Sequence, residues 1–439
     1  MENLHNLVQQ NAVMVSATIL IIAYIFIAWE KISKVTVALI GASITLFLGL
    51  LSSDKTPEAI QHYFINYVDF NVIFLLVSMM IIVHISAESG VFKRFAYEIL
   101  KLTKGKPKMV LFALSVFTAV ASAFLDNVTT VILVMPITFA ACKKLEINPI
   151  PFLITEILCS NIGGTATLIG DPPNIIIGSA AGFSFLDFVK ELTLIVILIM
   201  LITVSLMIFV FRKQLKSTPE KMEVVAKIDT SKCIKDIRLA IRSIVVLCLV
   251  ILGFMTHDLT HIPTYLIAMM GASFLLAFEK PHKILINVEW NTIFFFIGLF
   301  LIIGGLEAAG GIDLMAKWLL NVAQGSQEAM SMIILWASGI LSGIIDNIPY
   351  TATMAPMIAE ITSSQGMDFA YPLWWALSLG ACLGGNMTII GAAANVIVSE
   401  SSAAAGHPIK FMHFLKYGVL VTMISLAMST VYVWFKYLA

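Results

Sequence analysis

The chain has 439 residues, of which 59% are hydrophobic and only 12% are charged, and its formal net charge is zero. Soluble domains carry about 25% charged residues, so this composition predicts a polytopic membrane protein. The zero net charge argues against nucleic-acid binding, and the continuous apolar runs argue against a transmembrane barrel, whose strands alternate in polarity. The 5 cysteines show no paired spacing, which gives no support to a disulfide framework or a structural zinc site.

Apolar runs of about 20 residues predict the membrane spans. The first run follows a polar segment without a basic n-region, so we interpret it as a retained span and not as a signal peptide. The long run 109–142 is interrupted by Asp126-Asn127, which predicts a re-entrant hairpin of two short arms. The elements predicted in the first half are spans at 13–29, 35–51, 72–85 and 192–211, an amphipathic stretch at 91–102, the hairpin 109–142, and a broken helix at 150–161 and 174–181.

A basic connector covers 212–242, and after it the pattern repeats. The second half again has a hairpin interrupted by Asp-Asn, here Asp346-Asn347, followed by a broken helix. Its predicted elements are spans at 241–255, 263–278, 292–306 and 414–435, an amphipathic stretch at 311–322, the hairpin 330–361, and a broken helix at 372–383 and 395–402. The division that follows is an N-terminal span (1–32), a first repeat (33–211), the connector (212–242), a linking span (241–261) and a second repeat (262–437).

The two helix breaks carry the most informative motifs. The first reads GGTATLIGDPPN over Gly163–Asn174, and GGNMTIIGAAANV recurs over Gly384–Val396. Glycine weakens a helix and proline removes a donor, so unpaired backbone groups lie at membrane depth. Protein, water or a ligand must satisfy those groups. Interrupted segments at matching places in two halves point to the binding site of a transporter.

The distribution of lysine and arginine predicts the orientation. If the connector is cytoplasmic, all basic residues lie inside except Lys55, Lys190, Lys317 and Lys436. The N-terminus is then outside, and the two broken helices cross in opposite directions. The predicted fold class is therefore an all-α polytopic membrane protein of the plasma membrane, with two inverted-topology repeats, each with a re-entrant hairpin and a broken transmembrane helix.

The carboxylates at membrane depth are candidates for function, because inserting one costs about 2.5–3.5 kcal/mol. Asp126 and Asp346 are predicted as proton carriers or cation ligands, with helix capping as the alternative. Asp171 has Ala392 in its corresponding place, and for it proton coupling and helix capping both stay open. The other predicted substrate- or ion-binding residues are Asn127, Thr129, Thr130, Asn347 and Thr351 at the hairpin tips and Gly163, Gly164, Thr165, Thr167, Asn174, Gly384, Gly385, Asn386, Thr388 and Asn395 at the breaks.

Several of these residues have a second interpretation. Asn174 and Asn395 either satisfy the loop backbone or reach the ligand. Cys159 and Cys382 flank the breaks and could contact As(III) as thiols, although free cysteine is commonly a small buried apolar residue. Glu156, which precedes the first break, is a further ionisable residue at membrane depth. No other metal site is predicted.

The chain resembles the ion transporter superfamily, and most of all its branch of arsenical pump (ArsB), NhaD and P-protein sequences. The motifs that carry the resemblance are DNVTTV at Asp126–Val131, SNIGGTATLIGDPPN at Ser160–Asn174, DNIPYTATMAP at Asp346–Pro356 and ACLGGNMTIIGAAANV at Ala381–Val396. The resemblance covers essentially the whole chain. It implies scaffold and transport domains, an elevator-like movement, a homodimer, and transport residues at the tips and breaks. In the dicarboxylate branch of this superfamily the hairpin tips resemble Ser-Asn-Thr, whereas the first position here is aspartate in both halves. This difference favours proton coupling over sodium-coupled dicarboxylate uptake.

The resemblance leaves the substrate open among three transport functions. The first is proton-coupled efflux of arsenite or antimonite, and so arsenical resistance. The second is sodium/proton antiport of the NhaD type, and the third is transport of a small organic anion such as citrate. Apart from the coupling ion, no cofactor is predicted, and any ATP drive would need a separate ATPase subunit. A membrane-embedded enzyme is a further alternative, but the sequence shows no nucleophile–base pair and no HExxH motif. A pure channel is another, but two inverted broken helices favour alternating access.

Overall fold

The computed structural model describes residues 10–29, 31–50, 56–227, 233–234 and 236–439. This part of the chain is helical without any strand, which confirms the predicted all-α class. Nine of its helices are long and apolar enough to cross a membrane, and three shorter apolar helices accompany them. The protein is therefore a multi-pass membrane protein. The predictions that fall on Leu51, Lys55, Lys232, Lys235 and residues 1–9 lie outside the described residues.

The helices of the first half follow the predicted order. An additional short helix, α4, precedes α5, and the amphipathic stretch forms α6 with the predicted bounds. The elements are α2 (Ala12–Trp29), α3 (Lys34–Leu48), α4 (Pro57–Tyr67), α5 (Phe70–Glu88), α6 (Val91–Leu102), α7 (Pro107–Phe124), α8 (Asn127–Leu145), α9 (Ile150–Gly164), α10 (Pro172–Ala181) and α11 (Phe185–Val210).

The second half repeats this order after the connector, which itself contains α12. The elements are α12 (Pro219–Ala226), α13 (Ile237–Met255), α14 (His257–Thr260), α15 (Thr264–Leu276), α16 (Pro281–Leu285), α17 (Trp290–Ala308), α18 (Gly311–Val322), α19 (Gln327–Ile345), α20 (Asn347–Gln365), α21 (Met367–Gly384), α22 (Ala393–Ala404), α23 (Phe411–Val433) and a terminal π-helix (Trp434–Leu438). The order α17 to α23 matches α5 to α11, which is consistent with the predicted repeats.

The hairpin arms are somewhat longer than the sequence indicated. α7 and α8 have 18 and 19 residues, and α19 and α20 have 19 each. Pro107 starts α7 early because the first turn of a helix does not need its N–H. By length and composition, three of these arms could cross a membrane, and the re-entrant character of the hairpins stays a prediction.

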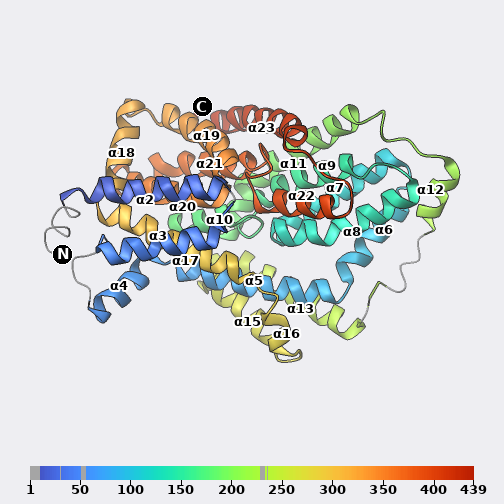
Figure 1. The fold of residues 1–439 in the computed structure, drawn as a ribbon, viewed down its shortest axis with the longest axis horizontal. Coiled ribbons are helices and arrows are strands. Elements are labelled where there is room, and N and C mark those ends of the chain that lie inside the picture. The colour runs from blue at the N-terminus through green and yellow to red at the C-terminus, as the bar shows by residue number, and fades with distance from the viewer. Residues whose placement is uncertain (1–9, 30, 51–55, 228–232, 235) are drawn as a thin grey trace.

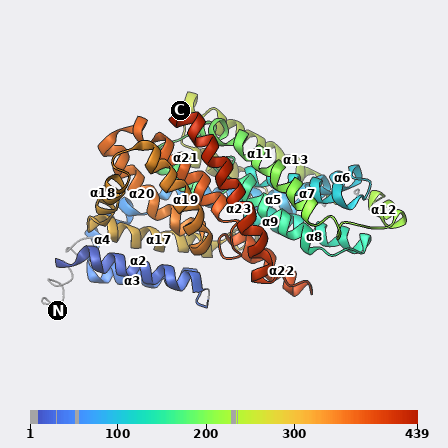
Figure 2. The same ribbon diagram turned by 90° about the horizontal axis from the view of Figure 1, so that it is seen from above.

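The two halves interlock. α3 packs on α17 of the other half, and α15 packs on α5 (Figure 1). The helix that follows each break packs against the opposite half of the chain: α10 contacts α20 and α21, while α22 contacts α8 and α9. Seen from above, α2 and α3 lie beside α17 at one edge of the molecule (Figure 2). Neither half can therefore build the central region alone.

The helices before the breaks form the centre of the core. In α9 every residue from Pro151 to Gly164 is buried, and in α21 every residue from Pro372 to Gly384 is buried. α7 and α11 pack on α9, and α19 and α23 pack on α21. Both broken helices consequently end deep inside the protein, where their free backbone groups need internal partners.

Candidate functional site

The two hairpin tips and the two helix breaks meet in one buried group of side chains. We call this group the central cluster; its members are Asn127, Asn161, Asp171, Asn347, Asn386 and Asn395, all buried. Asn161 Nδ2 donates to Asn386 Oδ1 at 3.0 Å and to Asn395 Oδ1 at 2.9 Å. Asn127 Nδ2 donates to Asn161 Oδ1 at 3.3 Å. Residues from both halves thus join in one hydrogen-bond network.

Asp171 is the carboxylate of this cluster. Asn127 Nδ2 donates to its Oδ1 at 3.2 Å, and Asn347 Nδ2 donates to its Oδ1 and Oδ2 at 3.3 and 3.1 Å. Asp171 also stands at the N-cap of α10, yet its side chain makes no capping bond. The next two residues are Pro172 and Pro173, which have no N–H to donate. The geometry therefore disfavours the capping interpretation and directs Asp171 toward both tips.

Asn174 and Asn395 hold the loops of the two breaks in the same way. Asn174 Nδ2 donates to the carbonyls of Thr165 and Thr167 at 3.1 and 2.9 Å. Asn395 Nδ2 donates to those of Gly385 and Thr388 at 2.7 and 2.8 Å. Both Nδ2 groups therefore satisfy the loop backbone, and contact of either residue with a ligand stays a prediction.

The threonines and glycines of the breaks also have backbone partners. The hydroxyl of Thr167 donates to the carbonyl of Ala123, and that of Thr388 donates to Gly343, the residue that corresponds to Ala123. A Cβ on Gly163 would lie 2.1 Å from the oxygen of Ala119, and one on Gly384 would lie 2.6 Å from that of Gly339.

These two glycines allow α9 and α21 to approach the first arms of the hairpins closely. Gly164 and Gly385 serve a similar purpose inside the loops, where an added Cβ would lie 2.6 Å and 3.1 Å from the oxygens of Gly170 and Gly391. The glycine pairs thus have a packing role in both breaks.

The two tip aspartates lie in different surroundings. Asp126 has an ordinary backbone (φ −66°, ψ 155°) and caps α8: the N–H and hydroxyl of Thr129 donate to its carboxylate at 2.7 and 2.6 Å. Asp346 is buried and has φ +102°, a region in which a side chain other than glycine costs about 1–3 kcal/mol. Its carboxylate accepts from Ile348 N–H at 3.1 Å and pairs with Lys34 Nζ at 3.2 Å. Within the part of the chain that the structure describes, neither carboxylate makes a hydrogen bond to the central cluster.

The remaining predicted threonines divide into two kinds. Thr165 and Thr351 donate to the carbonyls of Asn161 and Asn347, one helical turn before them. Thr130 is fully buried, and its hydroxyl has no hydrogen-bond partner within the described residues. An unpaired buried hydroxyl one turn after Asp126 is a free donor or acceptor near the first tip.

The two cysteines that flank the breaks and Glu156 lie in the interior. Cys159 and Cys382 are buried free thiols, and Cys382 Sγ donates to Asn174 Oδ1 at 3.4 Å. Cys382 therefore contacts Asn174 of α10, three residues after Asp171. Glu156 is buried on α9 and accepts a hydrogen bond from Thr138 at 2.5 Å.

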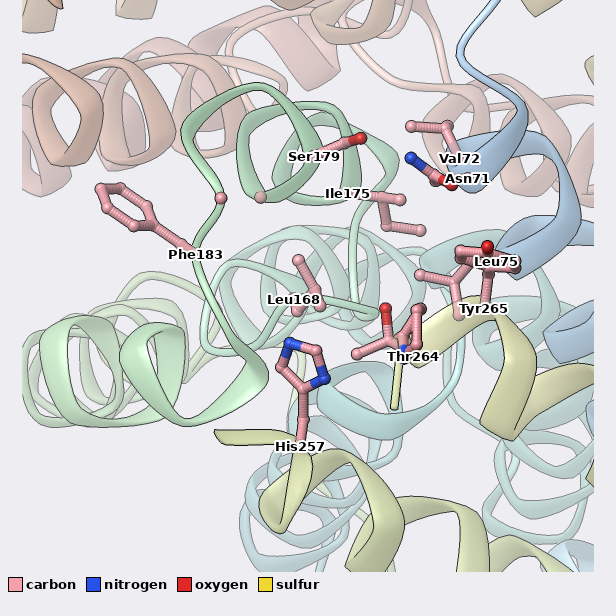
Figure 3. A pocket seen from close by; sticks show the side chains of 13 residues that line it. Asn71, Val72, Leu75, Leu168, Ile175, Ser179, Phe183, His257, Thr264 and Tyr265 are labelled. Atoms are coloured by element: carbon pink, nitrogen blue, oxygen red, sulfur yellow. The ribbon is translucent and has the colours of Figure 1, made fainter. Parts of the chain in front are cut away.

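A cavity of about 310 Å³ lies beside the first break (Figure 3). Asn71 and Val72 of α5, Leu168 of the break and Ser179 of α10 line it, together with Thr264 at the start of α15. His257 points into the same space. No tip residue lines this cavity among the residues that the structure describes.

A second cavity, of about 460 Å³, lies beside the second tip. We call it the acid-lined cavity, because Glu289, Asp346 and Glu400 line it against the single base Lys34. Its lining repeats that of the first cavity at corresponding positions: Asn291 for Asn71, Thr292 for Val72, Val396 for Ile175, Glu400 for Ser179 and Lys34 for Thr264. Unlike the first cavity, it reaches both tips, at Val128 and at Ile345-Asp346.

Sequence reasoning missed four residues of the site. Asn161 was only part of a motif, although a buried amide two residues before a glycine pair was a usable signal. The sequence indicates Lys34 only as one of the basic residues that predict the orientation in the membrane. Glu289 and Glu400 stand at the edges of apolar runs, where solvent exposure is the ordinary explanation, and only the packing of α3, α17 and α22 around the tip brings them to one cavity.

The fold and this site define a membrane transporter class, and comparisons with known proteins agree. The family described as citrate transporter (CitMHS) matches residues 24–380. The chain is 40% identical over 427 residues to a "46 kDa membrane protein" of Mycobacterium leprae, covering 97% of this chain and 99% of that protein. It is 39% identical over 426 residues to an uncharacterized transporter of Mycobacterium tuberculosis, covering 96% and 98%. It is also 28% identical over 503 residues to the human P protein, of which 60% is covered.

The chain belongs to the citrate transporter family. The expected resemblance to the ion transporter superfamily and its P-protein group is confirmed. The protein is a multi-pass membrane transporter of small solutes, and its listed relatives include mycobacterial proteins named as uncharacterized transporters.

Proposed function

We propose that the protein is a proton-coupled secondary active transporter that exports arsenite or antimonite. The observation that carries the proposal is the meeting of both tips and both breaks in the central cluster, beside a cavity that reaches the tips. Sites of secondary transporters lie where discontinuous helices of two repeats meet. Asp126, Asp346 and Asp171 are the candidates for carrying the proton.

The chemistry of the site favours a neutral hydroxylated solute or a cation as cargo. The central cluster offers amide groups and one carboxylate, which suit the hydroxyls of As(OH)₃ as donors and acceptors. The acid-lined cavity holds three carboxylates and one lysine, so it repels a free polyanion. Cys382 contacts Asn174, three residues after Asp171, and offers a thiol to a thiophilic centre.

Two other cargoes remain candidates, each on a specific observation. Citrate or a related organic anion is the second candidate, because the description of the matching family is citrate transporter. Sodium/proton antiport is the third, because carboxylate and amide oxygens are ligands for hard cations. We further propose that the protein lies in the plasma membrane with the connector 212–242 on the cytoplasmic side. The proposal also includes a homodimer and an accessory ATPase subunit.

Flux measurements on the purified protein in proteoliposomes test this proposal. With a proton gradient imposed, we expect arsenite to move against its own gradient and opposite to the protons. Sodium and citrate are measured in parallel under the same gradient. Sodium/proton exchange in the absence of arsenite would replace the first candidate by the third, and citrate flux without arsenite flux would replace it by the second.

A variant in the cluster tests the role of the site itself. We expect Asp171→Asn to lower coupled flux by at least about 100-fold, because an amide offers one acceptor oxygen to two amide donors and cannot hold a proton as an acid. The matched control is Asp187→Asn at the first turn of α11, whose carboxylate contacts Ser184 and lies outside the cluster. Equal flux in both variants would exclude the central cluster as the transport site.

A further inference from the structure

The two hairpin tips have the same Asp-Asn sequence but different hydrogen-bond partners. At the first tip, Thr129 supplies an N–H and a hydroxyl to Asp126. The corresponding residue at the second tip is Pro349, which has neither an N–H nor a hydroxyl. Asp346 therefore lacks both of these partners, and one side of its carboxylate is left for another group.

Lys34 takes that place from a different part of the molecule. Its Nζ lies 3.2 Å from Asp346 Oδ2, and the two side chains are 31% and 7% exposed. Lys34 starts α3, which packs on α2 and α17, whereas Asp346 joins α19 to α20. The ion pair thus bridges two helix groups at the wall of the acid-lined cavity, and the lysine is its more exposed partner.

Among the described residues, Asp126 at the first tip has no equivalent of this ion pair. The residue that corresponds to Lys34 is Thr264, which lines the first cavity away from any tip residue (Figure 3). The backbone strengthens the difference: Asp346 has φ +102°, and the N–H of Asn347 is fixed to the carbonyl of Gly391 in the second break at 3.2 Å. The second tip is therefore held in a strained conformation that presents its carboxylate to Lys34.

We infer that Lys34 and Asp346 form an exchange site, in which the lysine competes with the coupling cation for the carboxylate. A proton or sodium ion that arrives through the acid-lined cavity neutralises Asp346, so the bridge to α3 opens. Lys34 keeps its charge and finds Glu289 and Glu400 in the same cavity. When the cation leaves, the ion pair closes again. This inference rests on the proposed cation-coupled transport and assigns the coupling position within it.

Other groups around the second tip define the charge that Asp346 experiences. Glu289 at the start of α17 and Glu400 on α22 face the cavity. Asp171 lies behind Asn347 in the central cluster, and the hydroxyl of Tyr24 on α2 donates to the carbonyl of Pro349. Lys34 is the basic residue among these described neighbours. Removing it leaves the carboxylate of Asp346 among acidic groups without its counter-charge.

The test compares pH profiles of transport in proteoliposomes for wild type and Lys34→Met. An opposite charge within about 4–6 Å changes the proton affinity of a carboxylate by about 1–3 pH units. We therefore expect the pH of half-maximal transport to rise by about one unit or more in Lys34→Met. Lys34→Arg keeps the charge and should restore the wild-type profile, and Lys31→Met, an exposed lysine over the ring of Trp29, should leave it unchanged.

The outcomes separate this inference from the proposed function. Wild-type flux without any dependence on protons or sodium would remove the proposed function and the inference with it. Cation-coupled wild-type flux with superimposable profiles for wild type and Lys34→Met would remove the inference alone. Hydrogen–deuterium exchange of the tip segment 342–352 gives a readout that needs no transport. Relative to the intrinsic amide exchange rate at each pH, we expect less protection at low pH in wild type and in Lys34→Arg, and a transition displaced to higher pH in Lys34→Met; an undisplaced transition would overturn the inference.

Discussion

The two helix breaks of this protein have matching hydrogen-bond partners, whereas the two hairpin tips that meet them have different ones. In both breaks an asparagine holds the loop by two backbone carbonyls, a threonine ties the loop to the first arm of the hairpin, and a glycine permits close packing. At the tips, Asp126 caps its own helix while Asp346 pairs with a lysine from α3. The repeat therefore reproduces the backbone scaffold and differs in the placement of charge.

The division has a physical reason. A broken helix inside a membrane protein must satisfy the same free N–H and C=O groups in either half, so each break requires the same local solution. A carboxylate at a tip can instead be satisfied by an N-cap bond, by an ion pair or by an incoming cation. An asymmetric transport cycle needs only one such carboxylate to be free to exchange its partner.

The largest expected effect tests whether both breaks depend on close packing. Gly163→Val and Gly384→Val should each prevent folding, because their Cβ atoms would lie 2.1 and 2.6 Å from backbone oxygens of α7 and α19 and such overpacking costs about 1–3 kcal/mol or more. The measurement is the monodisperse fraction in size-exclusion chromatography. Gly325→Asn is the control, because nothing lies within 4 Å of a Cβ added at this position and Asn tolerates a positive φ. A normal yield for one glycine variant alone would break the similarity of the two halves.

The next effect separates the tips. We expect Asp346→Asn to change the pH dependence of transport and to lower coupled flux by at least about 10-fold, because an amide does not take up a proton in this range. Asp126→Asn should retain coupled flux within a factor of about 3, since an asparagine also caps a helix. Both are measured by flux in proteoliposomes at several pH values. Loss of coupling in Asp126→Asn would restore equal roles for the two tips.

A smaller effect tests the asparagines of the breaks. Asn174→Ala and Asn395→Ala each remove two hydrogen bonds to buried carbonyls, and the loss of buried partners costs about 1–3 kcal/mol. We expect both variants to lower the melting temperature in detergent to a similar extent. Ser363→Ala, at an exposed hydroxyl near the end of α20, is the control. A marked difference between the two asparagine variants would contradict the matched construction of the breaks.

The smallest effect concerns the cap at the first tip. Thr129→Val removes the hydroxyl bond to Asp126 but leaves the N–H bond, and we expect a loss of at most about 1 kcal/mol. Thermal unfolding measures it, and the pH profile of transport should not move. A displaced profile would mean that Asp126 also exchanges protons.

The sequence by itself determined the class of the protein and the outline of its fold. Apolar runs predicted most helix ends to within about four residues, because burial in lipid or protein requires continuous apolar surface. The starts of α11 and α21 lie further upstream than predicted, at Phe185 and Met367 instead of 192 and 372. The recurrence of GGxxTxIG and of Asp-Asn located both breaks and both tips, because glycine and polar residues inside apolar runs are costly and therefore noticeable.

Only the tertiary structure decided which of those residues share an environment. The meeting of Asp171 with Asn127 and Asn347 depends on α10 packing against the opposite half. The pairing of Lys34 with Asp346 joins residues 312 positions apart, and no local pattern encodes a contact at that separation. Burial and helix breaks are local properties of a sequence, whereas the partner of a charge is chosen by the packing of the whole chain.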